Sequence, residues 1–168
     1  TEEKITQIAQ LVASETPLLQ WPAEWFEVHN TAHQRSLLLT EYFLPGSAMQ
    51  KALIHGKDET LAEILRSDLR GRGGAGFGTG KKWQLCQQAP GHAHYVVCNA
   101  DEGEPGTFKD RMLLCDHADA LFEGMTLCAF IIGAEQGFVY LRGEYRYLLT
   151  HLHTVLNRRR QQRLLGQH

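Results

Sequence analysis

A strand–helix–strand pattern in the second half of the chain is the strongest constraint on its fold. Residues 95–98 and 137–141 are short apolar runs of the kind that form strands. Between them, residues 119–132 have the length of a helix and carry apolar side chains throughout. Strands joined by a long helical crossover lie parallel, and the connection is right-handed. We therefore predict an α/β fold with a parallel sheet built from βαβ units.

The first 50 residues predict a mainly helical arm. Apolar residues recur at helical spacing from Ile5 to Val12, and prolines 17 and 22 end that pattern. Three aromatic residues follow closely enough to form a cluster, which would anchor a partner protein: Trp21, Trp25 and Phe26. We expect residues 1–50 to be an arm for docking or packing, and residues 51–168 to form the α/β domain.

Two further helices are expected beside the crossover helix. One begins near Asp58 or Thr60, where Thr60-x-x-Glu63 has the form of a capping box. The other covers residues 145–165 and carries three arginines, 158–160, near its end. Those arginines favour a solvated helix terminus, where cations offset the dipole, over a nucleic-acid patch.

Composition limits the classes of function. The chain is 43% hydrophobic and 21% charged, with a net charge of -2, which gives no whole-chain field to attract nucleic acid. No apolar run reaches the roughly 18 residues of a spanning helix, and the N-terminus has no secretory signal pattern. The four cysteines form no Cys-x-x-Cys pair and are expected to be small buried thiols, so no metal site is predicted. We expect a cytoplasmic or equivalent reducing compartment.

Residues 70–83 hold six glycines in fourteen positions and are not expected to form a regular element. The spacing Gly71-x-Gly73-x-x-Gly76 matches the dinucleotide fingerprint, but that fingerprint follows a strand, whereas this one follows a helix. A Walker A loop is excluded because Lys82 stands where Ser or Thr is needed. Successive glycines still let backbone N–H groups approach a planar, phosphate-bearing ligand, with cations alongside at Arg70, Arg72, Lys81 and Lys82. The alternative is a flexible surface loop.

Residues 99–110 form a second candidate site, directly after the first strand. Ligands of parallel α/β sheets bind beyond the carboxyl ends of strands, so this loop is suitably placed. Asn99 can both donate and accept hydrogen bonds, and three carboxylates crowd within four positions: Asp101, Glu102 and Glu104. The alternative is a solvated acidic turn that pairs with Lys109 and Arg111.

Together, the two segments resemble the FMN/NADH-binding subunit of respiratory complex I. The motifs are Arg-Gly-Arg-Gly-Gly-Ala-Gly-Phe-x-Thr-Gly-x-Lys-Trp and Val-Cys-Asn-Ala-Asp-Glu-x-Glu-Pro-Gly-Thr-Phe-Lys-Asp-Arg. They are also similar to the diaphorase subunits of NAD-reducing nickel–iron hydrogenases and of some formate dehydrogenases. The run Tyr140-Leu-Arg-Gly-Glu144-Tyr fits the same family, and the hydrogenase branch is favoured. The resemblance implies a Rossmann-like FMN-binding domain.

The resemblance also implies roles for individual residues. Gly71, Arg72 and Gly73 would wrap the FMN, and Lys82 would lie near its phosphate or isoalloxazine. Asn99 and Asp101 would bind the flavin and its ribityl chain. The residues on the nicotinamide side would be Gly74, Ala75 and Phe77, with Glu102 and Glu104 bounding the NADH pocket and Glu104 the better candidate for a direct contact. No side chain is expected to act as acid, base or nucleophile, because the cofactor does the redox chemistry.

The family implies an NADH oxidoreductase that passes a hydride between NADH and FMN and sends electrons to iron–sulfur subunits of a larger complex. Its second flavin-site motif and the ligands of its 4Fe-4S cluster do not occur in this sequence. We expect a truncated chain, with a split subunit or a diverged remnant as alternatives. An incomplete fragment that serves as a binding or assembly module therefore stays open beside the enzyme.

Overall fold

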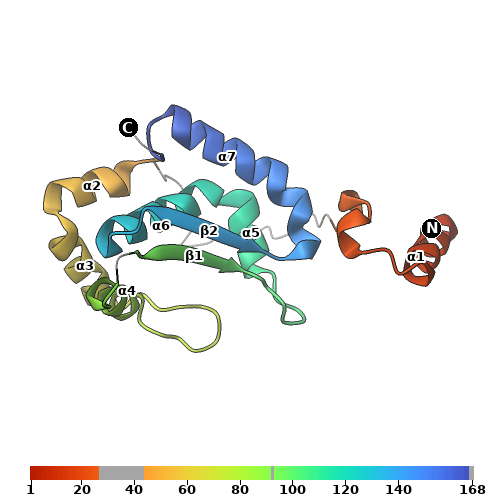
Figure 1. The fold of residues 1–168 in the computed structure, drawn as a ribbon, viewed down its shortest axis with the longest axis horizontal. Coiled ribbons are helices and arrows are strands. Elements are labelled where there is room, and N and C mark those ends of the chain that lie inside the picture. Colours follow the sequence, from red (N-terminus) through yellow and green to blue (C-terminus); the bar gives the residue numbers. More distant parts are fainter. Residues whose placement is uncertain (27–43, 92, 167–168) are drawn as a thin grey trace, which may run out of the picture.

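The computed structural model describes residues 1–26, 44–91 and 93–166 (Figure 1). None of the helices in these ranges has the length and apolar character needed to cross a membrane. The α-helices are α1 (Glu2–Ala13), α2 (Ser47–His55), α3 (Lys57–Arg66), α4 (Thr79–Gln88), α5 (Lys109–Asp116), α6 (Ala118–Ile132) and α7 (Leu149–Gln161). Short 3-10 helices are η1 (Leu18–Gln20), η2 (Ala23–Trp25) and η3 (Gly143–Leu148), and the strands are β1 (Tyr95–Ala100) and β2 (Gln136–Leu141).

The predicted βαβ unit is confirmed. β1 and β2 pair in parallel, with Val97 opposite Phe138, and α6 connects them. Each strand is slightly longer than the apolar run that predicted it. The described part of the chain is a mixed α/β structure in which helical residues far outnumber strand residues.

The sheet has one covered and one open face. Val96 and Ala100 point toward α6 and are buried, and Ile131 of α6 is buried against the same side. On the other face, Val97 and Phe138 are exposed. Parallel sheets are normally covered on both faces, whereas in the described residues only the α6 face of this sheet is covered.

The helices before the sheet differ from expectation at two points. The sequence does not predict α2, because its apolar periodicity is weak. The α3 helix begins at Lys57, and its N-cap is Gly56. Thr60 therefore lies inside the helix, where its hydroxyl donates to the Gly56 carbonyl at 2.7 Å. The predicted capping box is wrong because a glycine with positive φ already ends α2 and starts α3 at the same residue.

After β1 the chain forms more and shorter helices than predicted. The single helix expected over residues 145–165 is a 3-10 turn, η3, followed by α7. The sequence does not predict α5, since its four apolar residues, 112–115, are consecutive and show no helical spacing, and it directly precedes α6. His117 separates α5 from α6, with a backbone conformation outside the helical region.

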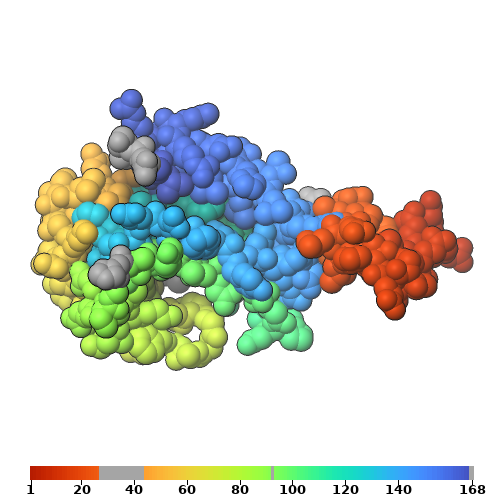
Figure 2. All heavy atoms as spheres, in the orientation of Figure 1, coloured from red at the N-terminus to blue at the C-terminus, as the bar shows by residue number. Residues whose placement is uncertain are grey.

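The N-terminal arm is helical as expected, and Figure 2 shows it projecting from the rest of the molecule. The predicted aromatic cluster is present: the Trp21 ring lies 6.3 Å from Trp25 and 6.5 Å from Phe26. The Arg146 guanidinium of η3 lies over the Phe26 ring at 5.9 Å, which joins the arm to the α/β part. Residues 27–43 of the expected arm lie outside the described residues, and α2 spans the boundary expected after residue 50.

None of the four cysteines forms a disulfide. Only Cys128 is buried, and Cys86, Cys98 and Cys115 are half-buried, so the expectation of buried thiols holds in full for one of them. Burial raises the pKa of Cys128 to about 11, with a smaller contribution from Cys86. Cys128 is therefore a packing residue at neutral pH.

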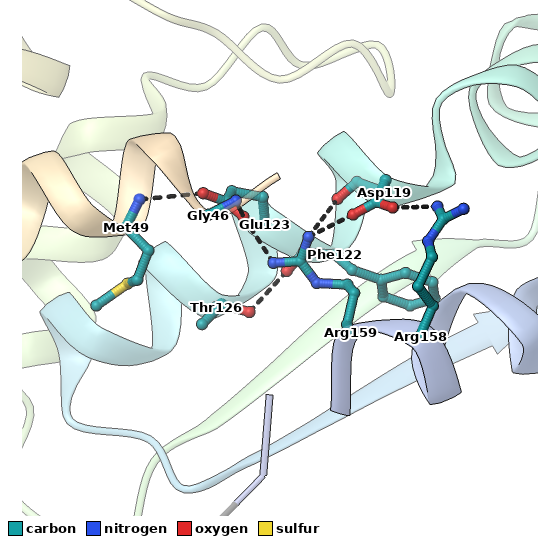
Figure 3. A network of polar contacts seen from close by, with 8 residues as sticks. All are labelled: Gly46, Met49, Asp119, Phe122, Glu123, Thr126, Arg158 and Arg159. Atoms are coloured by element: carbon teal, nitrogen blue, oxygen red, sulfur yellow. Dashed lines mark hydrogen bonds and ion pairs between the residues drawn. The ribbon is translucent and has the colours of Figure 1, made fainter. Parts of the chain in front are cut away.

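A buried charge network holds α2, α6 and α7 together (Figure 3). Arg159 of α7 is 0% exposed, and its guanidinium contacts Glu123 at 2.6 Å and Asp119 at 2.5 Å, both on α6. Glu123 in turn accepts hydrogen bonds from the backbone N–H groups of Gly46 and Met49, at the start of α2. The expectation that all three terminal arginines are solvated is wrong for the middle one.

The partners of Glu123 decide its charge state. Burial alone would raise its pKa, but the hydrogen bonds from Arg159, Met49 and Gly46 together outweigh burial and hold the pKa below the usual 4.5. Glu123 is therefore ionised at neutral pH. Arg158, one residue before Arg159, contacts Asp119 from the exposed side of the helix.

We predict that Arg159→Met lowers the free energy of unfolding by about 3–5 kcal/mol, because it leaves Glu123 buried without its cation. Urea unfolding followed by circular dichroism would measure this loss. Arg158→Met is the matched control, and its exposed ion pair should contribute about 1 kcal/mol or less. Equal losses in the two variants would contradict the structural role given to Arg159.

Candidate functional site

The glycine-rich loop joins α3 to α4 and is closed at its base by backbone hydrogen bonds. The Gly71 N–H donates to the Phe77 carbonyl at 2.9 Å, and the Thr79 N–H donates to the Leu69 carbonyl at 2.7 Å. Arg70 and Gly78 also pair as an isolated antiparallel bridge. The loop follows a helix, as predicted, which confirms that it is not the phosphate loop of a dinucleotide fold.

The tip of the loop, residues 72–76, has an accessible backbone. A Cβ atom placed on Gly73, Gly74 or Gly76 would meet no other atom within 4 Å. Gly74 and Gly76 have φ values of 109° and 60°, which side-chain-bearing residues rarely adopt. Gly71, Arg72, Gly73, Gly74 and Ala75 are all exposed. A ligand can therefore approach the backbone N–H groups without displacing a side chain.

The last part of the segment is regular, contrary to expectation. The α4 helix begins at Thr79, so residues 79–83 are helical. Gly80 is buried where α4 crosses α3, and a Cβ there would lie 2.9 Å from the backbone nitrogen of Leu65. This glycine serves helix packing and not ligand access.

Two predicted site residues lie together at the junction of loop and helix. The Phe77 ring is 47% exposed, and the Lys82 ammonium lies 6.0 Å from its centroid. Lys82 is itself exposed. Lys81 instead donates to Gln84 at 3.0 Å, and Arg70 pairs with Asp68 at 3.0 Å. The four cationic residues of the segment, Arg70, Arg72, Lys81 and Lys82, are all exposed.

The acidic segment begins inside β1 and ends inside α5. Asn99 is a residue of β1, and its side-chain oxygen accepts the Asp101 N–H at 3.1 Å. Asp101 and Glu104 are exposed, and Asp110 lies in α5, where it pairs with Lys109. The segment lies at the carboxyl end of β1, as predicted. Figure 1 shows it and the glycine-rich loop both projecting below β1.

Glu102 differs from its neighbours because it is only 5% exposed. Its carboxylate accepts the backbone N–H of Asp110 at 3.0 Å, the N–H of Arg111 at 3.4 Å and the hydroxyl of Tyr145 at 3.0 Å. The side chain therefore caps the start of α5 and ties it to η3. The alternative of a wholly solvated acidic turn does not hold for this residue.

Arg142 is a site residue that motif reasoning did not single out. It follows β2 directly, its backbone N–H donates to the Ala100 carbonyl at 3.2 Å, and its guanidinium donates to the Glu102 carbonyl. It also pairs with Glu144 at 2.7 Å. The hydrogen bond to Glu144 raises the pKa of Arg142, and the charge of Asp101 adds to the effect. The guanidinium thus sets a positive charge beside the acidic segment.

Tyr145 and Glu102 shift each other's pKa in opposite directions. Burial favours a neutral Glu102, but the hydrogen bonds from Asp110, Tyr145 and Arg111 outweigh it and lower the pKa below 4.5. Burial and the carboxylate of Glu102 raise the pKa of Tyr145 to about 12. The pair is therefore carboxylate and phenol at neutral pH, with the phenol as donor.

We predict that Glu102→Gln lowers the free energy of unfolding by about 1–3 kcal/mol at pH 7, because charge-assisted hydrogen bonds to α5 and Tyr145 are weakened. The folded-state pKa is depressed, so this stabilisation is present above pH 4.5 and is lost as the pH falls further. Unfolding measured from pH 7 to pH 3 should show the two proteins converge. The exposed Glu104→Gln is the matched control, and a difference that persists at pH 3 would contradict the assignment.

Residues 64–165, more than half of the chain, match the family described as the Nuo51 FMN-binding domain. The chain is 50% identical over 120 residues to the alpha subunit of the NAD-reducing hydrogenase HoxS of Cupriavidus necator, covering 71% of this chain and 20% of that protein. It is 49% identical over 111 residues to a subunit of the NADH-quinone oxidoreductase of Rhizobium meliloti, covering 64% of this chain and 26% of that protein.

A solved structure agrees with these matches. The crystal structure of an NAD+-reducing nickel–iron hydrogenase in the H2-reduced state superposes with a TM-score of 0.75 and 41% identity, over 94% of this chain and 28% of that one. The chain thus spans only 20–28% of the length of these relatives. By its match over residues 64–165, the chain belongs to the Nuo51 FMN-binding domain family.

Proposed function

We propose that this chain builds one side of an FMN site at which NADH is oxidised within a larger complex. The observation that carries the proposal is the glycine-rich loop, whose backbone is open at Gly73, Gly74 and Gly76 while its base is closed by hydrogen bonds. When bound, FMN supplies the chemistry of accepting a hydride and releasing electrons singly. The protein supplies binding and orientation.

The loop suits a flavin with a phosphate tail. Gly71, Arg72 and Gly73 wrap the ligand. The Gly71 N–H already donates to the Phe77 carbonyl, so the backbone donors to the ligand come from the residues that follow Gly71. The Lys82 ammonium faces the phosphate or ring edge of the ligand. The support is that no side chain occupies the space above Gly73 and that Lys82 is exposed at the same end of the loop as Phe77. A side chain at Gly73 would narrow this approach.

The end of β1 supplies hydrogen-bonding groups to the flavin and its ribityl chain. Asn99 and Asp101 lie at the carboxyl end of the strand, where parallel sheets bind ligands. The charge of Asp101 contributes to the raised pKa of Arg142, so the guanidinium stays charged beside this end of the strand. Asp101 is exposed, so it is accessible to hydroxyl groups of a ligand.

The nicotinamide side is formed by Gly74, Ala75 and Phe77. The exposed Phe77 ring offers a face for stacking, and Gly74 in the same loop leaves room for a second ring. Glu104 is the better candidate for a direct contact with NADH, because it is exposed whereas Glu102 is committed to α5 and Tyr145. Glu102 then positions the acidic segment.

Electrons leave such a site through iron–sulfur clusters. The described residues contain no group of three or more His, Cys, Asp or Glu placed to hold a metal ion. We assign the acceptor clusters to iron–sulfur subunits of a hetero-oligomeric assembly. In support, the relatives are subunits of a hydrogenase and of an NADH-quinone oxidoreductase.

The second candidate function is that of an assembly module, and the arm favours it. The α1 helix has no buried residue, although Ile5 and Val12 form part of an apolar stripe. With Trp21, Trp25 and Phe26 partly open beside it, this arm suits docking onto a partner protein. Such a role is compatible with the flavin site, since the arm and the glycine-rich loop are separate surfaces (Figure 1).

We predict that FMN fluorescence is quenched on titration with the chain and saturates at one FMN per chain. Lys82→Ala should raise the Kd about tenfold or more, because a charged contact contributes about 1.5–3 kcal/mol. Lys57→Ala is the matched control: its ammonium also lies over a phenylalanine ring, at 5.3 Å from Phe130, but away from the loop. Equal Kd values for the two variants would contradict the site, as would absence of quenching that persists when a partner subunit is added.

We predict that two glycines of the same segment respond differently to alanine. Gly73→Ala should leave the urea unfolding midpoint unchanged and weaken FMN binding, because its Cβ points into open space. Gly80→Ala should lower the free energy of unfolding by about 1–3 kcal/mol, since its Cβ meets the backbone of Leu65. If Gly73→Ala bound FMN normally, the loop would not be the flavin cradle.

A further inference from the structure

Arg142 joins the carboxyl ends of the two strands to η3, although it is not among the ligand-binding residues of the proposed flavin site. It follows β2 directly, and its backbone N–H donates to the Ala100 carbonyl at the end of β1, at 3.2 Å. Its guanidinium donates from one terminal nitrogen to the backbone carbonyl of Glu102 and from the other to the carboxylate of Glu144, at 2.7 Å. One side chain therefore bonds to the acidic segment and to η3 at the same time.

Glu102 is held through its backbone as well as through its side chain. Its carbonyl accepts from Arg142, while its carboxylate accepts from Tyr145 and from backbone N–H groups at the start of α5. Asp101 and Glu104, which lie on either side of it in the sequence, are exposed. Each residue has only two soft backbone dihedrals, so a backbone held at one residue restricts the residues beside it. The contacts of Glu102 therefore also limit where these two carboxylates lie.

The contact uses the shape of arginine as well as its charge. The planar guanidinium presents its N–H donors in a fixed fork, so its two acceptors, the Glu102 carbonyl and the Glu144 carboxylate, are held at a set separation. The Arg142 side chain is 29% exposed, and charge-assisted hydrogen bonds are stronger where water is partly excluded. A lysine would keep the charge but offers a single ammonium on a flexible stem.

The charge of Arg142 also offsets repulsion among neighbouring carboxylates. Asp101, Glu102 and Glu104 lie within four positions, and Glu144 adds a further carboxylate beside the guanidinium. The hydrogen bond to Glu144 raises the pKa of Arg142, and the charge of Asp101 adds to the effect, so the guanidinium stays charged. Like charges at short range repel, and without this cation the carboxylates would tend to move apart.

We infer that Arg142 is a positioning residue: through the Glu102 carbonyl it fixes residues 101–104 in the conformation that presents Asp101 and Glu104 to the ligand. The inference deepens the proposed flavin site and rests on it for the ligand. The conformation itself is a property of the free chain, so it can be measured without FMN. The guanidinium acts through the protein backbone and needs no contact of its own with the ligand.

The first test is hydrogen exchange of the ligand-free chain, followed by nuclear magnetic resonance. Arg142→Gln should speed exchange of the Asp101 and Asp110 amides about tenfold, because their acceptors are side chains of the segment that Arg142 holds. Arg146→Gln is the matched control: it makes the same charge change in η3, but the Arg146 guanidinium lies over the Phe26 ring and should leave these amides unchanged. Should Arg142→Gln fail to fold, Glu144→Gln removes the second acceptor of the fork and should speed the same amides to a smaller extent.

The second test is FMN titration by fluorescence, with a partner subunit added if the chain alone does not quench. Arg142→Gln should raise the Kd about fivefold or more, at a urea unfolding midpoint that matches that of Arg146→Gln. Arg142→Lys should regain only part of the affinity, because it keeps the charge and loses the fork. An arginine that served stability alone would lower the midpoint and leave the Kd of the folded protein unchanged.

Unchanged exchange of the Asp101 and Asp110 amides in Arg142→Gln would overturn the inference. A wild-type Kd for the folded Arg142→Gln protein would do the same, and so would equal effects of Arg142→Gln and Arg146→Gln. Failure of the unsubstituted protein to bind FMN, even with a partner subunit, would count against the proposed function instead. The exchange measurement would then still decide whether Arg142 fixes the segment.

Discussion

The ion pair between Glu123 and Arg159 is the contact on which the arrangement of α2, α6 and α7 depends. Removing two charges from water is unfavourable, and the cost is offset only because each group has further partners: Glu123 also binds two N–H groups at the start of α2, and Arg159 also binds Asp119. The α2 helix, which leads to α3, α4 and the glycine-rich loop, is thus held in its orientation by this buried ion pair. This network therefore helps to set the position of the helices that lead to the glycine-rich loop.

The sequence correctly predicted the helices and strands that are determined by the residues within them. The two strands contain short apolar runs and α6 is a longer, mainly apolar segment, and the structure confirms all three elements. The burial of Arg159 could not be predicted, because three successive arginines at a helix end have the pattern of a solvated terminus. It depends on carboxylates 36 and 40 residues away on another helix. The failed capping box at Thr60 has a local cause that the motif overlooks, since Gly56 supplies the N-cap and so determines where α3 begins.

In the candidate site too, the sequence predicted some features and could not predict others. Residue types and spacing identified the glycine-rich loop and the segment after β1, because ligand access and strand ends have sequence signatures. The sequence could not distinguish Gly73, which faces open space, from Gly80, which packs on Leu65, since both lie in one glycine-rich run. Nor could it separate buried Glu102 from exposed Glu104, because the deciding partner, Tyr145, is 43 residues from Glu102. Tertiary contacts decide which residues of a motif are committed to packing and which stay accessible to a ligand.

The closed base of the glycine-rich loop has a thermodynamic consequence. Two backbone hydrogen bonds and a bridge already bring its ends together in the folded chain. The entropy of closing the loop is therefore lost during folding, and a ligand needs only to order the few residues at the tip. Fewer residues to immobilise means a smaller unfavourable entropy of association. A glycine-rich segment is the most mobile kind of backbone. Because its ends are already closed, it can bind a ligand at a smaller cost in conformational entropy.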